Sequence, residues 1–522
     1  MKRAAIAAAL LLLLTAGAGE AQILIIFETV VEEGDLIPGV GAVTTIDNLA
    51  VNDNFRWLVE ADTDHPNTDA DAVIIRNDTL YLREDQPLSQ PPGATLNTFD
   101  AVRLNNDGHS GWNFFLSGTS GSNDDSGIYY DTTLVIQESD VSTAPGFSPG
   151  TQYIGFFETH INDNREILIV ASVEDTAVAS TVDRALVIAE VDALGNLLSE
   201  TLIAMEEDTL AGQSEGIVDF GTGPHQTAFN NNGEALYFAD LTGATTTDGV
   251  IYLNHQLIAQ EGSPAPVAGR NYELLSSRGL DVNNGGGHVF KANLDGNTAD
   301  DEIIVKNGGV LAQEGGTMPD IAPYLFTSFG TTSGPIQIGD NGKVVWFGDW
   351  NDPNTDFDTG LFLDSVLIIQ EGVTMVDTDL IDEISSGQDA FDMSPSGQWL
   401  LFEVTFVNGN NAAVILDLTD PTAVATTTDL VAPAVLRAAP NPFSSETVVR
   451  FGLTERENVD LRVYDVRGRL VAVLADEAFP AGEHRVTWNG RDEGGRAAAA
   501  GTYFVRLKTA DQSRSFRIVH VR

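Results

Sequence analysis

The chain has 522 residues, no cysteine and a formal net charge of −49 at pH 7. The missing cysteines exclude disulfides, zinc–thiolate sites, iron–sulfur clusters and thiol nucleophiles. So negative a chain disfavours nucleic acids and anionic membranes as partners and favours cations or basic partners, although solubility of an exported protein would explain the charge equally well.

Residues 1–21 have the pattern of a secretory signal peptide. Lys2 and Arg3 precede an apolar run over 4–14, and small residues lead to a cleavage point before Gln22. An uncleaved membrane anchor is the alternative, but the run is shorter than the roughly 20 residues that span a bilayer. We therefore expect no transmembrane span and an exported location, at the outer surface or outside the cell, or alternatively in the periplasm.

A short phrase, an apolar strand that ends in Glu, recurs seven times. Its clearest copies are LIAQEG at 257–262, VLAQEG at 310–315 and LIIQEG at 367–372. Because every repeat would have the same crossing to the next one, we expect these carboxylates to accept backbone N–H bonds there, which is a structural role. The aligned glutamates are Glu33, Glu84, Glu138, Glu206, Glu261, Glu314 and Glu371.

A second phrase recurs with the same period: an apolar strand, an Asn/Asp/Gly turn, and another apolar strand. Its turn chemistry predicts tight β-hairpins of type I′. A polar loop, a third strand and the Glu-terminated fourth strand follow in each repeat. The seven copies begin at Leu49, Val102, Thr159, Thr227, Leu280, Ile336 and Phe391.

These repeats predict an all-β fold, a seven-bladed β-propeller over residues 22–418. A four-stranded unit cannot bury both of its faces alone, and repetition around an axis solves that problem. The last repeat lacks its fourth strand, whereas Ile26–Glu33 is a fourth strand with nothing before it. We expect this N-terminal strand to pair with Ala412–Leu418 and close the ring, which leaves no free sheet edge. An open solenoid stays as the alternative.

The charge balance changes abruptly near residue 433. Residues 434–522 carry 14 Arg and Lys and 11 Asp and Glu, a net charge of +3, so the rest of the chain carries −52. This step predicts a linker over 419–433 and a separate domain over 434–522. Alternating segments such as 461–464 and 503–507 indicate the strands of a β-sandwich there.

The C-terminal segment resembles the Ig-like domain of flagellar hook-capping proteins and the related C-terminal (type A) sorting domains of type IX secretion cargo. The resemblance rests on APNPF at 439–443, LRVYDVRGRLV at 461–471, PAGEHRVTWNGRDEGGR at 480–496 and GTYFVRL at 501–507. It implies an Ig-like fold and partners in secretion or surface-attachment machinery.

The propeller resembles secreted bacterial tandem repeats of the N-x-x-G-x-x-A-F kind. Asn283-x-x-Gly286-x-x-Val289-Phe290 is the nearest match, and the segment 393–402 is similar to a phrase of TolB-type propellers, with Ser396 in place of its usual Asp. This resemblance implies architecture and is silent on activity.

Signals for an enzyme are weak. Gly212–Gly216 matches G-x-S-x-G, but no helical pattern follows Ser214, as a nucleophile elbow requires. The histidines are scattered, and His160, His225 and His288 fall at different places in their repeats. We therefore expect no catalytic residue and no bound cofactor other than a metal ion.

Acidic loops offer a candidate metal site. The loops before the third strands and those after the repeated Glu open on one face of a meander, and carboxylates at such density suit Ca²⁺. No EF-hand pattern is present. The candidate ligands are Asp349, Asp352, Asp356 and Asp358, and then Asp62, Asp64, Asp69 and Asp71.

Other acidic and aromatic residues in the repeats have simpler interpretations. An Asp before a third strand is explained by turn formation, because its side chain can hydrogen-bond the backbone two residues on. The residues in this position are Asp71, Asp125, Asp248, Asp301 and Asp358. Trp57, Trp346 and Trp399 are expected in the core between blades. Trp350 lies in an acidic segment and could be an exposed platform for a sugar or peptide ligand.

Taken together, the sequence favours an exported, non-catalytic binding or structural protein. Its propeller would bind a glycan, peptide or protein, and its C-terminal domain would serve secretion or surface attachment. The alternative is a secreted hydrolase or lyase that acts on polysaccharide or peptide through carboxylates on the acidic face.

Overall fold

The computed structural model divides into two compact units, residues 1–424 and 425–522. In the first it describes residues 27–100, 102–174, 184–220, 227–331, 334–376, 379–387 and 389–418. In the second it describes 437–439, 443, 447–453, 456–465, 469–479, 482–492, 494–509 and 513–520. The predicted signal peptide and the predicted linker 419–433 lie outside the described residues.

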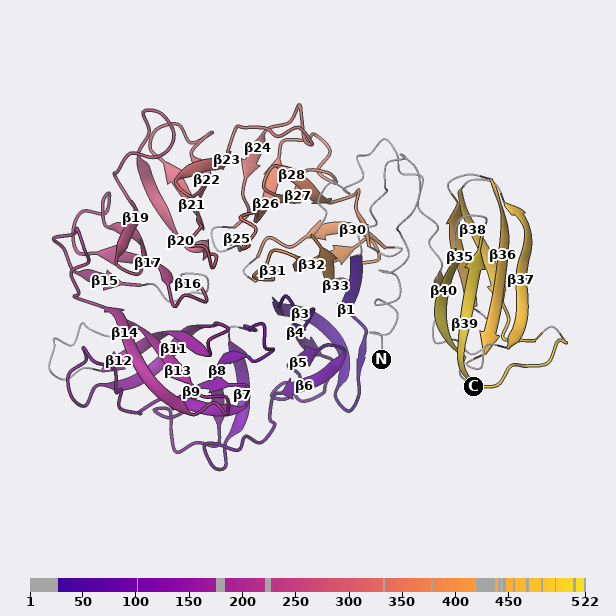
Figure 1. Ribbon diagram of the computed structural model, residues 1–522, viewed down its shortest axis with the longest axis horizontal. Helices are drawn as coiled ribbons and strands as arrows, with labels where there is room; N and C mark the ends of the chain where they lie inside the picture. Colours follow the sequence, from indigo (N-terminus) through magenta and orange to yellow (C-terminus); the bar gives the residue numbers. More distant parts are fainter. Residues whose placement is uncertain are drawn as a thin grey trace. The chain divides into compact units, whose positions relative to one another are not determined.

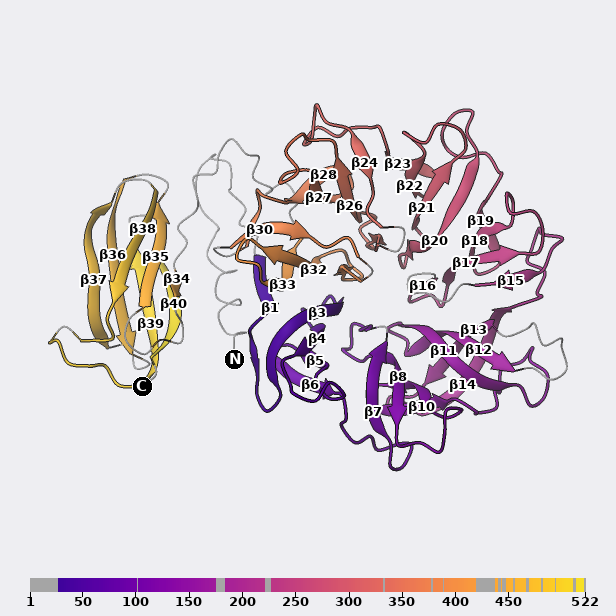
Figure 2. The same ribbon diagram turned by 180° about the vertical axis from the view of Figure 1, so that it is seen from behind.

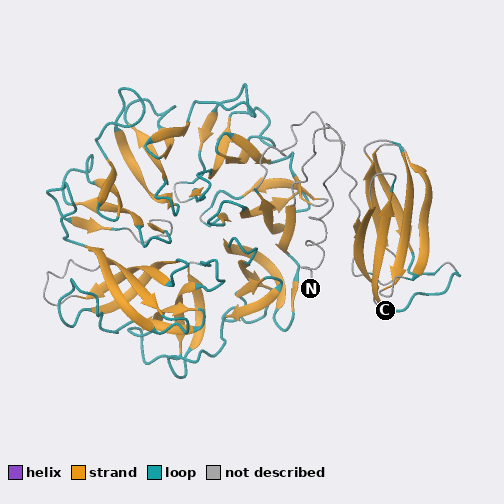
Figure 3. Ribbon diagram, viewed as in Figure 1, coloured by secondary structure: helices purple, strands orange, loops and turns teal. Residues whose placement is uncertain are grey.

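The fold is all-β, and Figure 3 shows only strands and loops in the described residues. The strands of the first unit form antiparallel sheets arranged around a common centre, as a β-propeller (Figures 1 and 2). We number these sheets 1 to 7 in chain order. Accordingly, among the described residues no helix is long and apolar enough to cross a membrane.

Sheets 1 to 4 occupy the N-terminal half of the propeller. Sheet 1 contains β2 (Leu36–Ile37), β3 (Gly41–Val51), β4 (Trp57–Thr63), β5 (Val73–Arg76) and β6 (Thr79–Arg83). Sheet 2 contains β7 (Thr95–Asp100), β8 (Gly111–Ser117), β9 (Ser126–Tyr130) and β10 (Thr133–Gln137). Sheet 3 contains β11 (Gln152–Ile161), β12 (Glu166–Glu174), β13 (Arg184–Val191) and β14 (Leu197–Met205). Sheet 4 contains β15 (Ile217–Asp219), β16 (Thr227–Phe229), β17 (Ala235–Leu241), β18 (Gly249–Leu253) and β19 (Gln256–Gln260).

Sheets 5 to 7 complete the propeller. Sheet 5 contains β20 (Tyr272–Val282), β21 (His288–Leu294), β22 (Glu302–Lys306) and β23 (Gly309–Gln313). Sheet 6 contains β24 (Phe326–Ser328), β25 (Gln337–Ile338), β26 (Val344–Trp350), β27 (Thr359–Leu363) and β28 (Val366–Gln370). Sheet 7 contains β29 (Met375–Val376), β30 (Asp379–Ile384), β31 (Phe391–Met393), β32 (Trp399–Phe406), β33 (Asn411–Asp417) and, from the other end of the domain, β1 (Phe27–Glu32).

The N-terminal strand closes the ring, as predicted. β1 pairs antiparallel with β33, from Phe27 opposite Leu416 to Glu32 opposite Ala412. The predicted partner residue Ile26 lies outside the described residues. β1 is the outermost strand of sheet 7, and all other strands of that sheet come from the C-terminal end of the propeller. The hydrogen bonds between β1 and β33 therefore join the two ends of the domain.

Hydrophobic side chains fill the space between successive sheets. Each of seven buried clusters combines residues from two neighbouring sheets, including one shared by sheets 7 and 1, where Val31, Val59 and Leu401 pack together. Strands buried on both faces explain the near-continuous apolar runs in the sequence. Trp57 and Trp346 are buried in these clusters, and Trp399 is half-buried against Phe55, with ring centroids 4.6 Å apart.

The hairpins between the first two strands of each repeat differ from the prediction. A type I′ turn has φ > 0 at both central residues. Here the turn spans four residues, and only the fourth has positive φ, as at Gly108, Gly233 and Gly286. The two-residue loops with positive φ at both positions join the third and fourth strands instead, at Asn77-Asp78 and Asn307-Gly308.

The second unit is a two-sheet sandwich. One sheet contains β34 (Arg437–Ala439), β35 (Thr447–Leu453) and β38 (Gly482–Trp488). The other contains β37 (Leu470–Phe479), β36 (Glu457–Asp465), β39 (Gly501–Lys508) and β40 (Ser513–His520). Trp488, Leu461 and Val505 are buried in its core.

Candidate functional site

The four-residue turns gather around the propeller axis. Each follows the innermost strand of its sheet, and Figure 1 shows β16, β25 and β31 ending near the centre. In five sheets the turn begins with an asparagine whose side-chain Oδ1 accepts the backbone N–H four residues on, as Asn105 Oδ1 does from His109 N at 2.8 Å. In four of them it also accepts the N–H two residues on. This local bonding fixes the turn because an Asn side chain can replace a backbone acceptor.

The same asparagines connect neighbouring sheets. The Nδ2 of Asn52 donates to the carbonyl of Asn105 at 2.8 Å, and Asn105 donates to Asn162 at 3.1 Å. The series continues through Asn230 and Asn283 to the carbonyl of Gly339. We call these five asparagines the first turn ring.

The next residue of each turn forms a second turn ring. In the first five of its members the backbone N–H donates to the side chain of the corresponding residue in the following sheet, at 2.7 to 3.0 Å. In the sixth, Asp340 N donates to the backbone carbonyl of Pro395 at 2.8 Å. Ser396 N closes this ring by donating to Asp53 Oδ1 at 2.8 Å. The members are Asp53, Asn106, Asp163, Asn231, Asn284 and Asp340.

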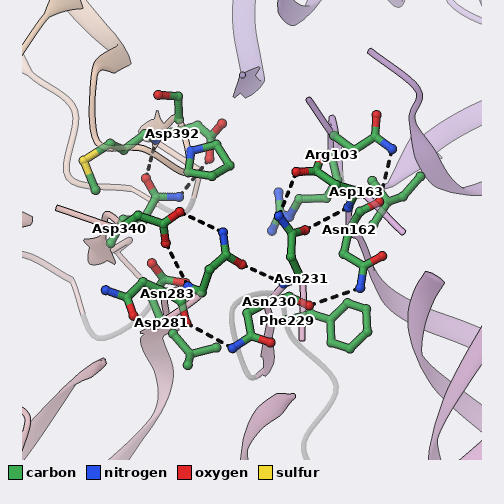
Figure 4. Close-up of a pocket in the computed structure, with 18 of the residues that line it drawn as sticks. Arg103, Asn162, Asp163, Phe229, Asn230, Asn231, Asp281, Asn283, Asp340 and Asp392 are labelled. Carbon is green, nitrogen blue, oxygen red and sulfur yellow. Dashed lines mark hydrogen bonds between the residues drawn. The ribbon is translucent and has the colours of Figure 1, made fainter. Parts of the chain in front are cut away.

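An axial pocket of about 140 Å³ lies within these rings, and all seven sheets contribute to its wall. The last residue before each turn gives it an apolar collar. The collar consists of Val51, Leu104, Ile161, Phe229, Val282, Ile338 and Met393. Amides and carboxylates of the turns form its rim (Figure 4).

Two carboxylates of the pocket wall also hold backbone amides of neighbouring sheets. Asp392 on β31 accepts Val51 N at 2.7 Å and Gln337 Nε2 at 2.8 Å. Asp281 on β20 accepts Ile338 N at 2.7 Å. These hydrogen bonds tie both carboxylates to backbone or side-chain amides of the neighbouring sheets and so fix their positions.

Arg103 is the cationic residue of the pocket wall and comes from the segment before β8 in sheet 2. Its Nη1 donates to Val102 O at 3.0 Å and lies 3.7 Å from Asp389 Oδ1. The side chain is 14% exposed. Figure 4 labels Asp163 next to Arg103, whereas Asp281 and Asp340, from sheets 5 and 6, lie on the opposite side of the pocket. The pocket wall therefore combines one guanidinium and several carboxylates with apolar side chains.

The repeated glutamates are not part of the wall of this pocket. Each accepts a hydrogen bond at the start of the third strand of its own sheet, as Glu84 does from Ala72 N and Glu261 does from Gly249 N, both at 3.2 Å. The corresponding donors for the others belong to Asn411, Ser126, Arg184, Glu302 and Thr359. Burial raises the pKa of Glu261, and Leu275 N of the next sheet also donates to it at 3.0 Å.

The residue after each repeated Glu makes the crossing between sheets. It has positive φ in every repeat, which explains the recurrent glycine at 262, 315 and 372. Its N–H donates to the first strand of the next sheet, as Gly262 N does to Tyr272 O at 2.8 Å. The repeated phrase along the chain thus supplies hydrogen bonds at the crossing between successive sheets.

The candidate calcium ligands do not converge. Thr327 Oγ1 donates to Asp349, Asn354 N donates to Asp352, and Ala42 N donates to Asp64. In the described part of the chain no three Asp, Glu or His side chains come together closely enough to hold a metal ion. The described residues therefore show no preformed group of three such ligands, and calcium binding stays a prediction.

Trp350 is not the exposed platform suggested by the sequence. Its side chain is 1% exposed, and it packs on Phe362 at a centroid distance of 6.0 Å. The reason is that β26 extends through residue 350, so Trp350 shares the buried face of Trp346. Ser214 lies in a loop between β14 and β15, and its Oγ donates to the adjacent Glu215.

Two carboxyls that sequence reasoning missed are the buried Glu60 on β4 of sheet 1 and the half-buried Glu403 on β32 of sheet 7. Burial raises the pKa of Glu60 to about 8 and that of Glu403 to about 7, and the Asp47 carboxylate raises both further. Glu60 is 8% exposed and accepts Asn48 Nδ2 at 2.6 Å. Neither carboxyl is part of the pocket wall. Their signal in the sequence is an acidic residue inside an otherwise apolar strand.

A family model described as a family of unknown function, DUF7453, matches residues 25–254 and again 194–410. The chain belongs to this family. The two overlapping matches agree with an internally repeated propeller. A second model, the FlgD Ig-like domain, matches residues 441–513 of the sandwich unit. No curated protein matches the sequence.

Three solved structures illustrate how distant the structural relatives of this family member are. PorZ of Porphyromonas gingivalis, a surface component of the type IX secretion system, is 13% identical, with a TM-score of 0.37 over 93% of this chain and 61% of PorZ. TolB of Acinetobacter baumannii is 11% identical, with a TM-score of 0.28 over 70% and 78%. An α-L-arabinanase of Penicillium chrysogenum is 11% identical, with a TM-score of 0.32 over 76% and 99%. The chain thus spans about three fifths of the length of PorZ.

Proposed function

We propose that this protein is an exported, non-catalytic binding protein whose propeller binds its ligand at the axial pocket. The observation that carries the proposal is the pocket itself, because all seven sheets contribute to it and its wall combines a collar of apolar side chains with fixed charges. Concave sites with a few convergent polar groups on an apolar lining are the usual form of small-ligand sites.

The arrangement of the carboxylates supports binding over catalysis. Acid–base catalysis needs a carboxyl that can exchange a proton with a bound substrate. Both oxygens of Asp392 accept hydrogen bonds from neighbouring sheets, and the repeated glutamates hold strand starts. These groups serve the fold, whereas the acidic loops do not bring three carboxylates together in the described residues.

The FlgD-type sandwich supports the second half of the proposal, a role in secretion or attachment to the outer surface. The sandwich has a net charge of +3, whereas the rest of the chain is strongly negative, and it does not contain the repeated phrases of the propeller. Deleting residues 434–522 in the native host should therefore leave the propeller inside the cell envelope. Protease digestion of intact cells measures this: full-length protein should be cleaved and the truncated protein protected.

The binding role is tested by a thermal-shift screen of the full chain with glycans, peptides and small polar compounds. A compound that raises the melting temperature of the wild type should lose its effect on Phe229→Trp, which adds volume to the pocket wall. The matched control is Phe147→Trp, which lies outside the pocket. A compound whose effect survives Phe229→Trp binds elsewhere and counts against the axial pocket.

A second candidate is a secreted hydrolase or lyase acting on polysaccharide or peptide. The observation that favours it is the raised pKa of Glu60 and Glu403, since a carboxyl protonated near neutral pH can act as a general acid. An activity screen on polysaccharides and peptides tests it. Any hydrolysis that Glu60→Gln and Glu403→Gln abolish would establish this alternative.

A further inference from the structure

The four-stranded sheet of the sandwich unit has an outer face of unusual composition. Its strands β37, β36 and β39 lie side by side (Figure 1). Successive side chains of a strand point to opposite faces of a sheet, and every second residue of β36 and β39 is buried in the core. The residues between the buried ones therefore share the outer face. On these two strands they are Asp460, Arg462, Tyr464, Phe504, Arg506 and Lys508, and we call this surface the outer sandwich face.

One row of the outer sandwich face is apolar. The register places Tyr464 between Leu470 of β37 and Phe504 of β39. Leu470 is 41% exposed, Phe504 is 39% exposed, and Val473 in the next row is 38% exposed. Exposed apolar side chains that lie together mark interaction sites, whereas single ones are normal on any surface. The row therefore indicates a partner that brings apolar side chains of its own.

The next row of this face places like charges side by side. Arg462 of β36 lies directly opposite Arg506 of β39, a position in which Cβ atoms are about 4.5–5.5 Å apart. Like charges directly opposite each other destabilise a sheet. Arg462 Nε donates to Asp460, and both Arg506 and Lys508 are exposed. A carboxylate from a partner would be attracted by both guanidinium groups of the pair, since guanidinium and carboxylate match in geometry as well as in charge.

The two rows together match a protein partner with acidic and apolar side chains. Aromatic residues and arginines are enriched where proteins bind each other, and they dominate the binding free energy there. The same face of a second copy does not fit, because its arginines would repel these ones. An anionic membrane would be repelled by the rest of the chain, which carries a net charge of −52.

We propose that the outer sandwich face docks on an acidic protein surface, with a carboxylate of the partner between Arg462 and Arg506 and an apolar side chain of the partner against Leu470 and Phe504. This inference rests on the proposed role of the sandwich in secretion or surface attachment. It adds the face that the sandwich uses and the chemistry of its partner.

Arg506→Glu tests docking separately from folding. The variant replaces a like-charge pair by an opposite-charge pair, so its melting temperature should equal or exceed that of the wild type. Its display in the native host, measured as the amount of protein that protease cleaves on intact cells, should nevertheless fall at least about tenfold. Arg496→Glu makes the same charge change in the exposed loop after β38 and should be displayed like the wild type.

The apolar row is tested by Phe504→Ser, which should lower display to a similar extent. If this variant has a lower melting temperature than the wild type, Arg506→Glu decides alone. Normal display of Arg506→Glu would overturn the proposal. An equal loss of display for Arg496→Glu would overturn it too, because the effect would then follow from charge anywhere on the sandwich.

The class of the partner is tested on the full chain. With benzoylphenylalanine in place of Phe504, irradiation of intact cells should give a protein adduct that Arg506→Glu removes. Purified protein should not bind vesicles of phosphatidylethanolamine and phosphatidylglycerol, and light scattering should give the mass of a single chain. Loss of display without a protein adduct, vesicle binding that Arg506→Glu abolishes, or a dimer that it dissociates would each overturn the acidic protein partner.

Deletion of residues 434–522 separates this inference from the proposed function. If the truncated protein stays inside the cell envelope while Arg506→Glu and Phe504→Ser are displayed normally, the outer sandwich face is not the docking surface and the proposed role of the sandwich stands. If the truncated protein is displayed like the wild type, both fail.

Discussion

At the scale of single residues, the buried carboxyl of Glu60 shows how an ionisable group acts on stability. Its pKa of about 8 in the folded protein lies above the value of 4.5 for an unperturbed Glu. The neutral form is therefore favoured by folding. This contribution to stability is complete below pH 4.5 and is lost as the pH rises through 8.

Replacing Glu60 by Gln should remove this pH dependence. The Gln side chain stays neutral, so Glu60→Gln should be more stable than the wild type above about pH 8, by a few kcal/mol, and closely similar below pH 4.5. Urea denaturation at pH 4.5, 6.5 and 8.5 measures the difference. A constant difference between variant and wild type over this range would contradict the assigned pKa.

The first turn ring offers a second residue-scale prediction. Asn105 is 2% exposed, accepts His109 N and donates to Asn162 O. Asn105→Ala leaves both partners buried without a bond and should lower the free energy of unfolding by about 1–3 kcal/mol. Asn97→Ala, in the outer part of β7, is the control and should have little effect. If Asn105→Ala and Asn97→Ala lower the free energy of unfolding equally, the first turn ring does not stabilise the propeller.

At the scale of elements, the closing strand β1 is expected to stabilise the whole propeller. β1 is the outer strand of sheet 7, and Glu33 N and Gly34 N bond to Asn411 O and Val43 O beyond it. Deleting residues 22–35 removes this ladder and exposes the edge of β33. We expect the free energy of unfolding to fall by more than about 3 kcal/mol, since several backbone hydrogen bonds and the burial of Val31 are lost.

A shorter deletion is the matched control for the closing strand. Removing residues 22–26 leaves β1 intact, so this variant should unfold at the same urea concentration as the mature chain. If the variant that lacks residues 22–35 unfolds at that same urea concentration, closure by β1 does not stabilise the propeller.

The element order could be predicted from the sequence because it depends on local patterns. Alternating apolar runs define the strands, and the closing strand is placed by a Glu phrase at the N-terminal end of the domain and by its absence from the last repeat. Trp350 was misplaced because the acidic residues around it suggested a loop, whereas alternation with Trp346 continues β26 through it. The turns were assigned to type I′ although their Asn-x-x-Gly spacing makes a four-residue turn.

The axial pocket could not be found in this way. Asn105 and Asn162 are 57 positions apart, and they meet only because the curvature of the ring brings successive turns together. The same holds for Arg103 and Asp281, which come from sheets 2 and 5 and line the same pocket only because the sheets close into a ring. Repeated glutamates are visible in a sequence, whereas residues that converge from different repeats are not.

At the scale of the whole molecule, the negative charge of the propeller should oppose its compact state. If calcium bound only the folded form, it would raise the free energy of unfolding by about 2.7 kcal/mol at a hundredfold excess over its Kd. Melting in CaCl₂ and in NaCl of matched ionic strength separates such a site from screening. A larger shift with calcium would establish a site, whereas equal shifts would mean screening alone, as the scattered loop carboxylates indicate.

The central claim, that this family member is a binding protein with its site on the propeller axis, is tested most directly by locating a bound ligand. A crystal structure of the full chain with the tightest compound from the screen should show ligand density between Phe229, Arg103 and Asp392, with the turn rings unchanged. Density for that compound on the outer strands or in the acidic loops, with the axial pocket holding only water, would contradict the account.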